Sequence, residues 1–290
     1  MISTNKPLLE NFKLIDAHIH FWNVNSLHYP WLITVPELNK SFELNEFYKE
    51  TKQVQIDKLI FIQAECLPEL YVKEIEYIQE LAALDPRIVA IIPYFPLEEK
   101  DAKSLLEKLT ENTLIKGIRR LEEEPITLYG NTAFMDNFPL LAEFNLTFDL
   151  GIKAHQLNAA IQLVDKFPHQ KFILDHAGKP PIKFKEINNW KSQIKALSSN
   201  PNVYCKLSGL ITESDLINWK AEDLKPYVDY LLEMFGTNRI AFGSDWPVVT
   251  LGATYQTWLS CAFELCDHLN SSELQQIFYQ NALDFYQLES

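Results

Sequence analysis

Short runs of apolar residues, many of them β-branched, alternate along the chain with longer stretches in which apolar residues recur every three or four positions. The short runs have the length of strands, and the longer stretches have the period of amphipathic helices. Strands are predicted at residues 14–21, 58–65, 89–95, 115–121, 146–152, 171–176, 203–208 and 239–245. Helices are predicted at residues 70–84, 102–109, 133–144, 156–167, 187–197, 224–235, 255–269 and 272–286. The longer connection after the first strand predicts a loop before its helix.

Regular alternation of strands and helices is typical of a parallel sheet, and eight such units in 290 residues favour a closed (β/α)8 TIM barrel of the α/β class. The alternative is an open, doubly wound sheet, but no glycine-rich phosphate-binding turn follows the first strand. No Gly/Ser linker or block of charge divides the chain. We therefore expect one domain over residues 1–290, with closing helices at about 255–286.

The charge balance narrows the range of partners. The formal net charge of -13 argues against binding to nucleic acid or to an anionic membrane surface. No apolar run approaches the length of a membrane span, and residues 1–13 lack the pattern of a signal peptide. The cysteines show no C-x-x-C spacing, so we expect reduced thiols in a cytoplasmic protein. These are Cys66, Cys205, Cys261 and Cys266.

Polar side chains gather where the predicted strands end. In a (β/α)8 barrel the active site lies at the carboxyl ends of the strands, because the strand-to-helix loops converge there. The residues at or just after these ends are His18, His20, Gln63, Glu65, Arg119, Arg120, Asp149, His155, Asp175, His176, Lys206, Ser208 and Asp245. We therefore expect the chemistry of this protein at that end of the barrel.

The His-x-His pair is the strongest candidate for a metal site. His18 and His20 are two residues apart on a strand, so both imidazoles point to the same face. Burying two imidazoles together needs a partner that a metal or a carboxylate supplies. Glu65 shares a face with Gln63 and is either a carboxylate ligand or an N-cap of the next helix. His155 is a further candidate ligand, although a single strand-end histidine is more often structural.

A second group of residues suits substrate binding. Arg119 and Arg120 point to opposite faces of a strand, so at most one faces the pocket. Lys179 is either a surface lysine or a partner for a substrate oxyanion. Trp22 and Trp246 either pack at the rim of the barrel or form walls of the pocket. The substrate-binding candidates are Arg119, Arg120, Lys179, Trp22, Trp246 and Ser208.

Five segments that carry these residues resemble the amidohydrolase superfamily, amidohydrolase-related family 2. The similarity is to its branch of predicted metal-dependent TIM-barrel hydrolases, which includes fuconolactonase-like and rhamnonolactonase-like sugar lactonases and a pyrone dicarboxylate lactonase. The segments come in the order of the family and span nearly the whole chain. They are residues 15–22 (IDAHIHFW), 116–120 (KGIRR), 174–180 (LDHAGKP), 203–210 (VYCKLSGL) and 242–247 (FGSDWP).

The resemblance implies an active site of His18, His20, His176 and Asp245. Binuclear members of the superfamily carry a metal-bridging lysine at the end of the fourth strand, where this chain has arginines and Lys116 lies too early. A binuclear centre is therefore not expected. Some lactonases of the branch are thought to work without metal, so one zinc or manganese ion and a metal-independent site both stay open. The candidate metal ligands are His18, His20, Glu65 and His155.

The resemblance also implies hydrolysis of a small-molecule lactone derived from a sugar acid. Asp245 would take a proton from the attacking water and give it to the ring oxygen as it leaves, with His176 as a second catalytic residue. The alternatives are a metal-dependent, non-oxidative decarboxylase of the same superfamily, a metal-independent pyrone dicarboxylate-type lactonase, and a catalytically inactive barrel that binds a partner. Barrels of this kind occur as monomers and as homodimers, and the sequence leaves both open.

Overall fold

The structure, a computed structural model, describes residues 12–121 and 127–289. Of residues 1–13, which lack the pattern of a signal peptide, residues 1–11 lie outside the described part of the chain. The strands are β1 (Ile15–Ile19), β2 (Lys58–Ile62), β3 (Ile88–Ile92), β4 (Gly117–Leu121), β5 (Thr147–Gly151), β6 (Phe172–Leu174), β7 (Val203–Leu207) and β8 (Ile240–Phe242). All eight predicted strands are confirmed, each somewhat shorter than expected. Strand β4 begins later than predicted, and the other seven strands pass into loops earlier than predicted.

The helices follow the predicted order. They are α1 (Leu44–Thr51), α2 (Tyr71–Leu84), α3 (Ala102–Leu109), α4 (Thr132–Asn137), α5 (Leu140–Glu143), α6 (Leu157–Lys166), α7 (Asn188–Ser198), α8 (Ala221–Phe235), α9 (Tyr255–Leu265), α10 (Ser271–Gln275) and α11 (Asn281–Phe285). The single helix predicted over residues 133–144 is wrong. Pro139 separates α4 from α5, because proline lacks the amide hydrogen that a continuous helix needs at this position. Among the described residues no helix is long and apolar enough to cross a membrane.

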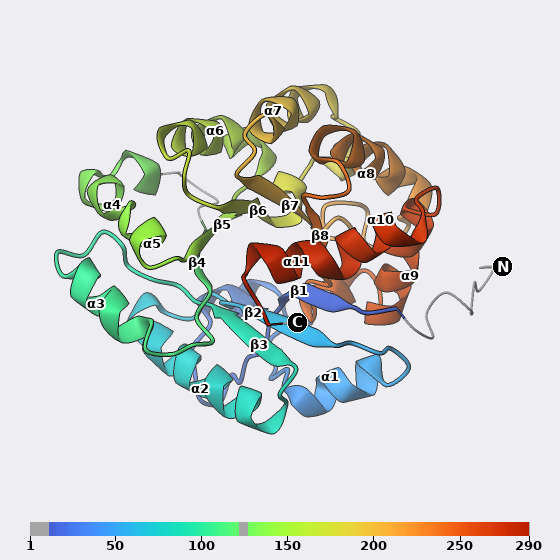
Figure 1. The fold of residues 1–290 in the computed structure, drawn as a ribbon. Coiled ribbons are helices and arrows are strands. Elements are labelled where there is room, and N and C mark those ends of the chain that lie inside the picture. The colour runs from blue at the N-terminus through green and yellow to red at the C-terminus, as the bar shows by residue number, and fades with distance from the viewer. Residues whose placement is uncertain (1–11, 122–126, 290) are drawn as a thin grey trace.

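The strands form one parallel ring (Figure 1). Strands β1 to β3 pair in order, and strands β4 to β8 pair in order. Isolated parallel bridges join the two sheets, from Ile19 to Trp246 at one seam and from Ile91 to Ile115 at the other. The backbone amide of His20 also donates to the carbonyl of Trp246 at 2.8 Å. The fold is therefore the predicted (β/α)8 TIM barrel.

Helix α11 closes the end of the barrel at which the strands begin. Figure 1 shows it crossing the middle of the ring, while most other helices lie around the outside. Its side chains join an apolar cluster with inward-facing strand residues, among them Ile15 and Ala241. Asn281 fixes the helix by donating to the carbonyls of Thr237 at 2.8 Å and Ile240 at 2.7 Å. The C-terminal segment is thus part of the core.

The segment between β1 and α1 packs over the opposite end of the barrel. Trp22 and Trp246 are both fully buried, and each packs edge-on against Phe42. The indole of Trp22 donates to the carbonyl of Lys40 at 2.7 Å. Of the two roles open for these tryptophans, the structure supports packing of the rim.

Truncating Phe285, a side chain of the closing helix α11, should lower the stability of the barrel. The Phe285 side chain is 1% exposed, whereas Phe184 is 71% exposed. We expect Phe285→Ala to lower the free energy of unfolding by about 3–5 kcal/mol, because it loses apolar burial and leaves a cavity. The matched Phe184→Ala should change it by less than about 0.5 kcal/mol. Urea unfolding followed by tryptophan fluorescence measures both, and equal effects would contradict this account of the closing helix.

Candidate active site

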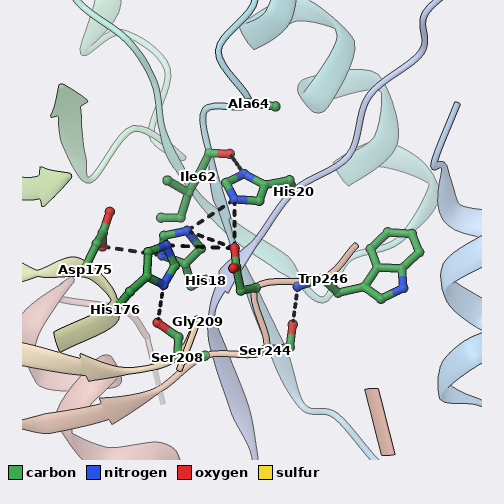
Figure 2. Close-up of polar contacts among 12 residues, drawn as sticks. His18, His20, Ile62, Ala64, Asp175, His176, Ser208, Gly209, Ser244 and Trp246 are labelled. Atoms are coloured by element: carbon green, nitrogen blue, oxygen red, sulfur yellow. Dashed lines mark hydrogen bonds and ion pairs between the residues drawn. The ribbon is translucent and has the colours of Figure 1, made fainter. Parts of the chain in front are cut away.

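Three imidazoles and one carboxylate meet inside the carboxyl end of the barrel. His18 lies on β1, His20 follows it, His176 follows β6, and Asp245 follows β8. The Oδ1 atom of Asp245 lies 3.7 Å from His18 Nε2, 3.4 Å from His20 Nε2 and 3.9 Å from His176 Nε2. Figure 2 shows the rings of His18, His20 and His176 close together. All four residues are buried.

The backbone places these side chains by unusual local geometry. His176 and Asp245 both have positive φ angles, 51° and 60°, which turn the chain sharply at the end of each strand. The backbone also needs glycine beside them. A Cβ on Gly243 would lie 2.6 Å from His18 Cβ, and a Cβ on Gly209 would overlap the His176 ring. Gly209 and Gly243 therefore leave room for the histidines.

Hydrogen bonds to neighbouring groups fix the Nδ1 atoms of His20 and His176. His20 Nδ1 lies 2.7 Å from the carbonyl of Ile62 and must donate to it, which leaves Nε2 unprotonated and facing the cluster (Figure 2). His176 Nδ1 lies 2.9 Å from the hydroxyl of Ser208. Ser208, a predicted substrate-binding residue, is fully buried and contacts His176 in this structure.

The electrostatics favour an ionised Asp245 carboxylate beside the neutral imidazoles of His18 and His176. Burial raises the pKa of Asp245, but the neighbouring His176, His20 and His18 lower it more, and the pKa lies well below its usual range. Burial lowers the pKa of His176 to about 4 and also lowers that of His18. Near neutral pH the site thus offers a carboxylate that can accept a proton.

The donor set fits one divalent metal ion. His18, His176 and Asp245 each offer a ligand atom, and these atoms lie within 4.8 Å of one another. Three protein ligands with an open position are typical of catalytic zinc sites. Asp175 Oδ1 lies 3.4 Å from His18 Nδ1, where a carboxylate can orient this ring as a metal ligand.

A buried layer of charge lies behind the cluster. Lys206 pairs with Asp149 at 2.6 Å and with Asp175 at 2.9 Å. Arg119 Nε lies 2.9 Å from the other oxygen of Asp175. Burial raises the pKa of Asp175, but Lys206, His18 and Arg119 lower this pKa by more, and the pKa lies well below its usual range. The carboxyl is therefore held ionised. The sequence placed these side chains at strand ends without assigning them this role.

The two adjacent arginines face opposite ways, as alternation along a strand predicts. Arg119 points inward, toward Asp175 and the carbonyl of Gln63. Arg120 turns away and forms an ion pair with Glu98 at 2.7 Å. Arg119 is thus the one of the pair that faces the site.

The other predicted site residues lie at its margin. Glu65 is half-buried, bonds to Gln63, and is outside the set of residues that could share a metal. His155 is exposed and is also outside that set, so the structure does not bring it to the cluster as a ligand. It follows β5 by several residues and sits in a turn leading to α6. Lys179 follows the His176 turn.

A groove beside the cluster does not include the cluster residues. This groove has a volume of about 1030 Å³ and runs between the loops after β5, β6 and β7. His155, Lys179, Phe184 and Ile217 are among its lining residues. Because Lys179 is close to the His176 turn, the groove reaches the margin of the buried site.

A buried acid supports the loop after β2. Glu74 lies on α2, is 1% exposed, and accepts a hydrogen bond from the amide of Ala64 at 3.1 Å. Burial is the main influence on this group and raises the pKa of Glu74 to about 8. Its carboxyl therefore carries a proton near neutral pH.

Comparison with known proteins places the chain in a family. It matches the Amidohydrolase family over residues 15–288 and belongs to that family. An L-fucono-1,5-lactonase from Burkholderia ambifaria is 27% identical over 290 residues, covering 95% of this chain and 96% of the relative. An L-rhamnono-gamma-lactonase from Scheffersomyces stipitis is 23% identical, covering 97% of this chain and all of the relative. The crystal structure of an amidohydrolase from Burkholderia multivorans with bound zinc has a TM-score of 0.87 and 26% identity, covering 95% of this chain and 99% of that one.

The raised pKa of Glu74 makes stability depend on pH. Between its ordinary pKa of 4.5 and the folded value of about 8, the folded state binds more protons than the unfolded state. Relative to Glu74→Gln, we therefore expect the free energy of unfolding to fall as pH rises, by about 1.4 kcal/mol per pH unit. Urea unfolding across this range measures the slope. The exposed Glu76→Gln on the same helix is the control, and parallel curves for wild type and Glu74→Gln would contradict the assignment.

Proposed function

We propose that the protein hydrolyses a lactone of a sugar acid. The observation that carries the proposal is the buried, ionised Asp245 at the centre of three imidazoles. The names of the fuconolactonase and rhamnonolactonase relatives support a sugar lactone as the substrate class. A lactone is an ester closed into a ring, so its hydrolysis needs an activated water, a polarised carbonyl and a proton for the ring oxygen.

Asp245 is proposed as the group that moves the proton. Its carboxylate takes a proton from water while the water oxygen bonds to the lactone carbonyl carbon. As the bond from that carbon to the ring oxygen breaks, Asp245 returns the proton to this oxygen. The products are a carboxylic acid and a hydroxyl group on one open chain. The imidazoles of His20 and His176 flank Asp245 and orient it for both transfers.

His18, His176 and Asp245 would hold a divalent metal ion, with His20 beside them. Such an ion supplies polarisation of the lactone carbonyl when bound. Zinc and manganese both accept imidazole and carboxylate ligands.

Polar groups around the cluster are proposed to bind the substrate. Arg119 faces the site and is held in place by Asp175, so its remaining hydrogens can donate to substrate oxygens. Glu65 and Gln63 bond to each other at the margin and suit sugar hydroxyls. Lys179 lies between the site and the groove, where a cation can attract a carboxylate.

A substrate panel tests the reaction class. We expect acid release from L-fucono-1,5-lactone or another aldonolactone, followed with a pH indicator at neutral pH. A pyrone dicarboxylate in the same panel tests the other lactonase branch, and carbon dioxide measured with aromatic acids tests the decarboxylase alternative. Carbon dioxide release without lactone hydrolysis would overturn the proposal.

Replacing the proposed base should remove activity while leaving the fold in place. We expect Asp245→Asn to lower kcat/KM for the lactone by at least about 100-fold, because an amide cannot accept the proton from water. Circular dichroism checks the fold. Asp267→Asn, at an exposed position, is the matched control and should retain activity. Retention of most activity by Asp245→Asn would show that another group is the base.

A further inference from the structure

Lys206 lies fully buried beneath the histidine cluster and bonds directly to one of its rings. Its Nζ atom donates to Asp149 Oδ2 at 2.6 Å and lies at hydrogen-bond distance, 3.2 Å, from His18 Nδ1. It also forms an ion pair with Asp175 Oδ1 at 2.9 Å. None of these side chains is exposed to solvent, so the geometry inside the barrel decides their hydrogen bonds.

The closing helix anchors this lysine from below. Asp149 Oδ2, which accepts from Lys206, also accepts from the hydroxyl of Tyr286 at 2.7 Å. The ammonium lies 5.7 Å from the centre of the Tyr286 ring, within the range of a cation–π contact. Lys206 is therefore held between the C-terminal segment and the site, with its free hydrogens directed at His18 and Asp175.

Hydrogen-bond directions select one tautomer of His18. An ammonium can only donate, so His18 Nδ1 must accept from Lys206. A neutral imidazole with a lone pair on Nδ1 carries its proton on Nε2. That Nε2 lies 3.2 Å from His20 Nε2, which is unprotonated because His20 Nδ1 donates to Ile62. Every donor along this chain of bonds thus meets an acceptor.

This tautomer conflicts with metal binding through the same ring. His18 Nε2 can ligate a metal only with its lone pair free, which moves the proton of a neutral ring to Nδ1. The Nδ1 hydrogen would then face the Lys206 ammonium and would need a different acceptor. Asp175 Oδ1 is such an acceptor: it lies 3.4 Å from His18 Nδ1 and, at 2.9 Å, also pairs with Lys206.

We propose that Lys206 is a positioning residue that competes with Asp175 for Nδ1 of His18, and so sets the tautomer of His18 and the zinc affinity of the site. Without metal, Lys206 holds the Nε2-protonated ring. Zinc binding requires the ring to exchange Lys206 for Asp175. The inference deepens the proposed function because it concerns the same site, and its readouts do not depend on turnover.

The first experiment reads the tautomer in the unaltered protein. Metal-free protein with 15N-labelled histidine should give His18 a pyridine-type Nδ1 and a pyrrole-type Nε2, opposite to the types at His20. A His18→Gln variant assigns the signals by their loss. Added zinc should convert His18 to a pyrrole-type Nδ1. A pyrrole-type Nδ1 already present in the metal-free protein would overturn the proposal.

The second experiment removes Lys206, and with it the charge of its partner Asp149, so that no net buried charge is left. In the double variant Asp149→Asn with Lys206→Met, we expect the pyrrole-type Nδ1 without metal and zinc binding about tenfold tighter, the lower limit of typical effects around metal ligands. Competition with a chromophoric chelator measures the affinity. Lys195→Met, on an exposed face of α7, is the control and should leave it unchanged.

Unchanged or weaker zinc binding in the folded double variant would overturn the proposal. If that variant fails to fold, the tautomer measured in the unaltered protein still decides. Failure of either readout in a protein that hydrolyses a lactone would leave the proposed function standing. Success in a protein that hydrolyses none would leave the tautomer control standing, so the two conclusions are separable.

Discussion

The seam between the first and last strands is the constraint on which the site depends. Asp16 Oδ1 accepts hydrogen bonds from the amides of Ser244 at 2.8 Å and His18 at 3.2 Å. The amide of Asp245 donates to the carbonyl of His18 at 2.8 Å. The bonds to Ser244 and Asp245 join segments more than 220 positions apart, so the contacts that close the barrel also align Asp245 with the histidines. Asp16 is buried, and solvent does not compete for these bonds.

Behind that seam, charge is balanced inside the barrel. Lys206 and Arg119 meet Asp149 and Asp175, so two cations face two carboxylates in a region without solvent. Removing one member of such a buried set commonly costs about 3–5 kcal/mol, because it leaves an uncompensated charge. The balance of charge therefore stabilises the four residues together. This pairing also keeps Arg119 directed at the site.

Some of this could be predicted from sequence, because strand alternation and strand ends follow directly from local patterns. The positions of His18, His176 and Asp245 at the carboxyl ends of their strands are of this kind. Alternation also indicated that Arg119 and Arg120 face opposite ways, but the choice between them depends on Glu98, which the loop after β3 supplies. His155 was expected near the site because it follows a strand, yet the turn after β5 carries it outward. Proximity to a strand end in sequence does not fix a side chain in space.

The contact between Tyr286 and Asp149 lies furthest beyond sequence reasoning. It spans 137 positions, and Tyr286 has the spacing of an ordinary apolar helix residue. Only closure of the barrel by α11 brings its hydroxyl to a carboxylate beneath the site. The phenol ring packs in the apolar core at the beginning of the strands, while its oxygen reaches the charged layer. Tyr286 thus belongs both to the apolar cluster under the closing helix and to the network that positions Lys206. The fold and the chemistry of this protein therefore share a residue at its C-terminal end.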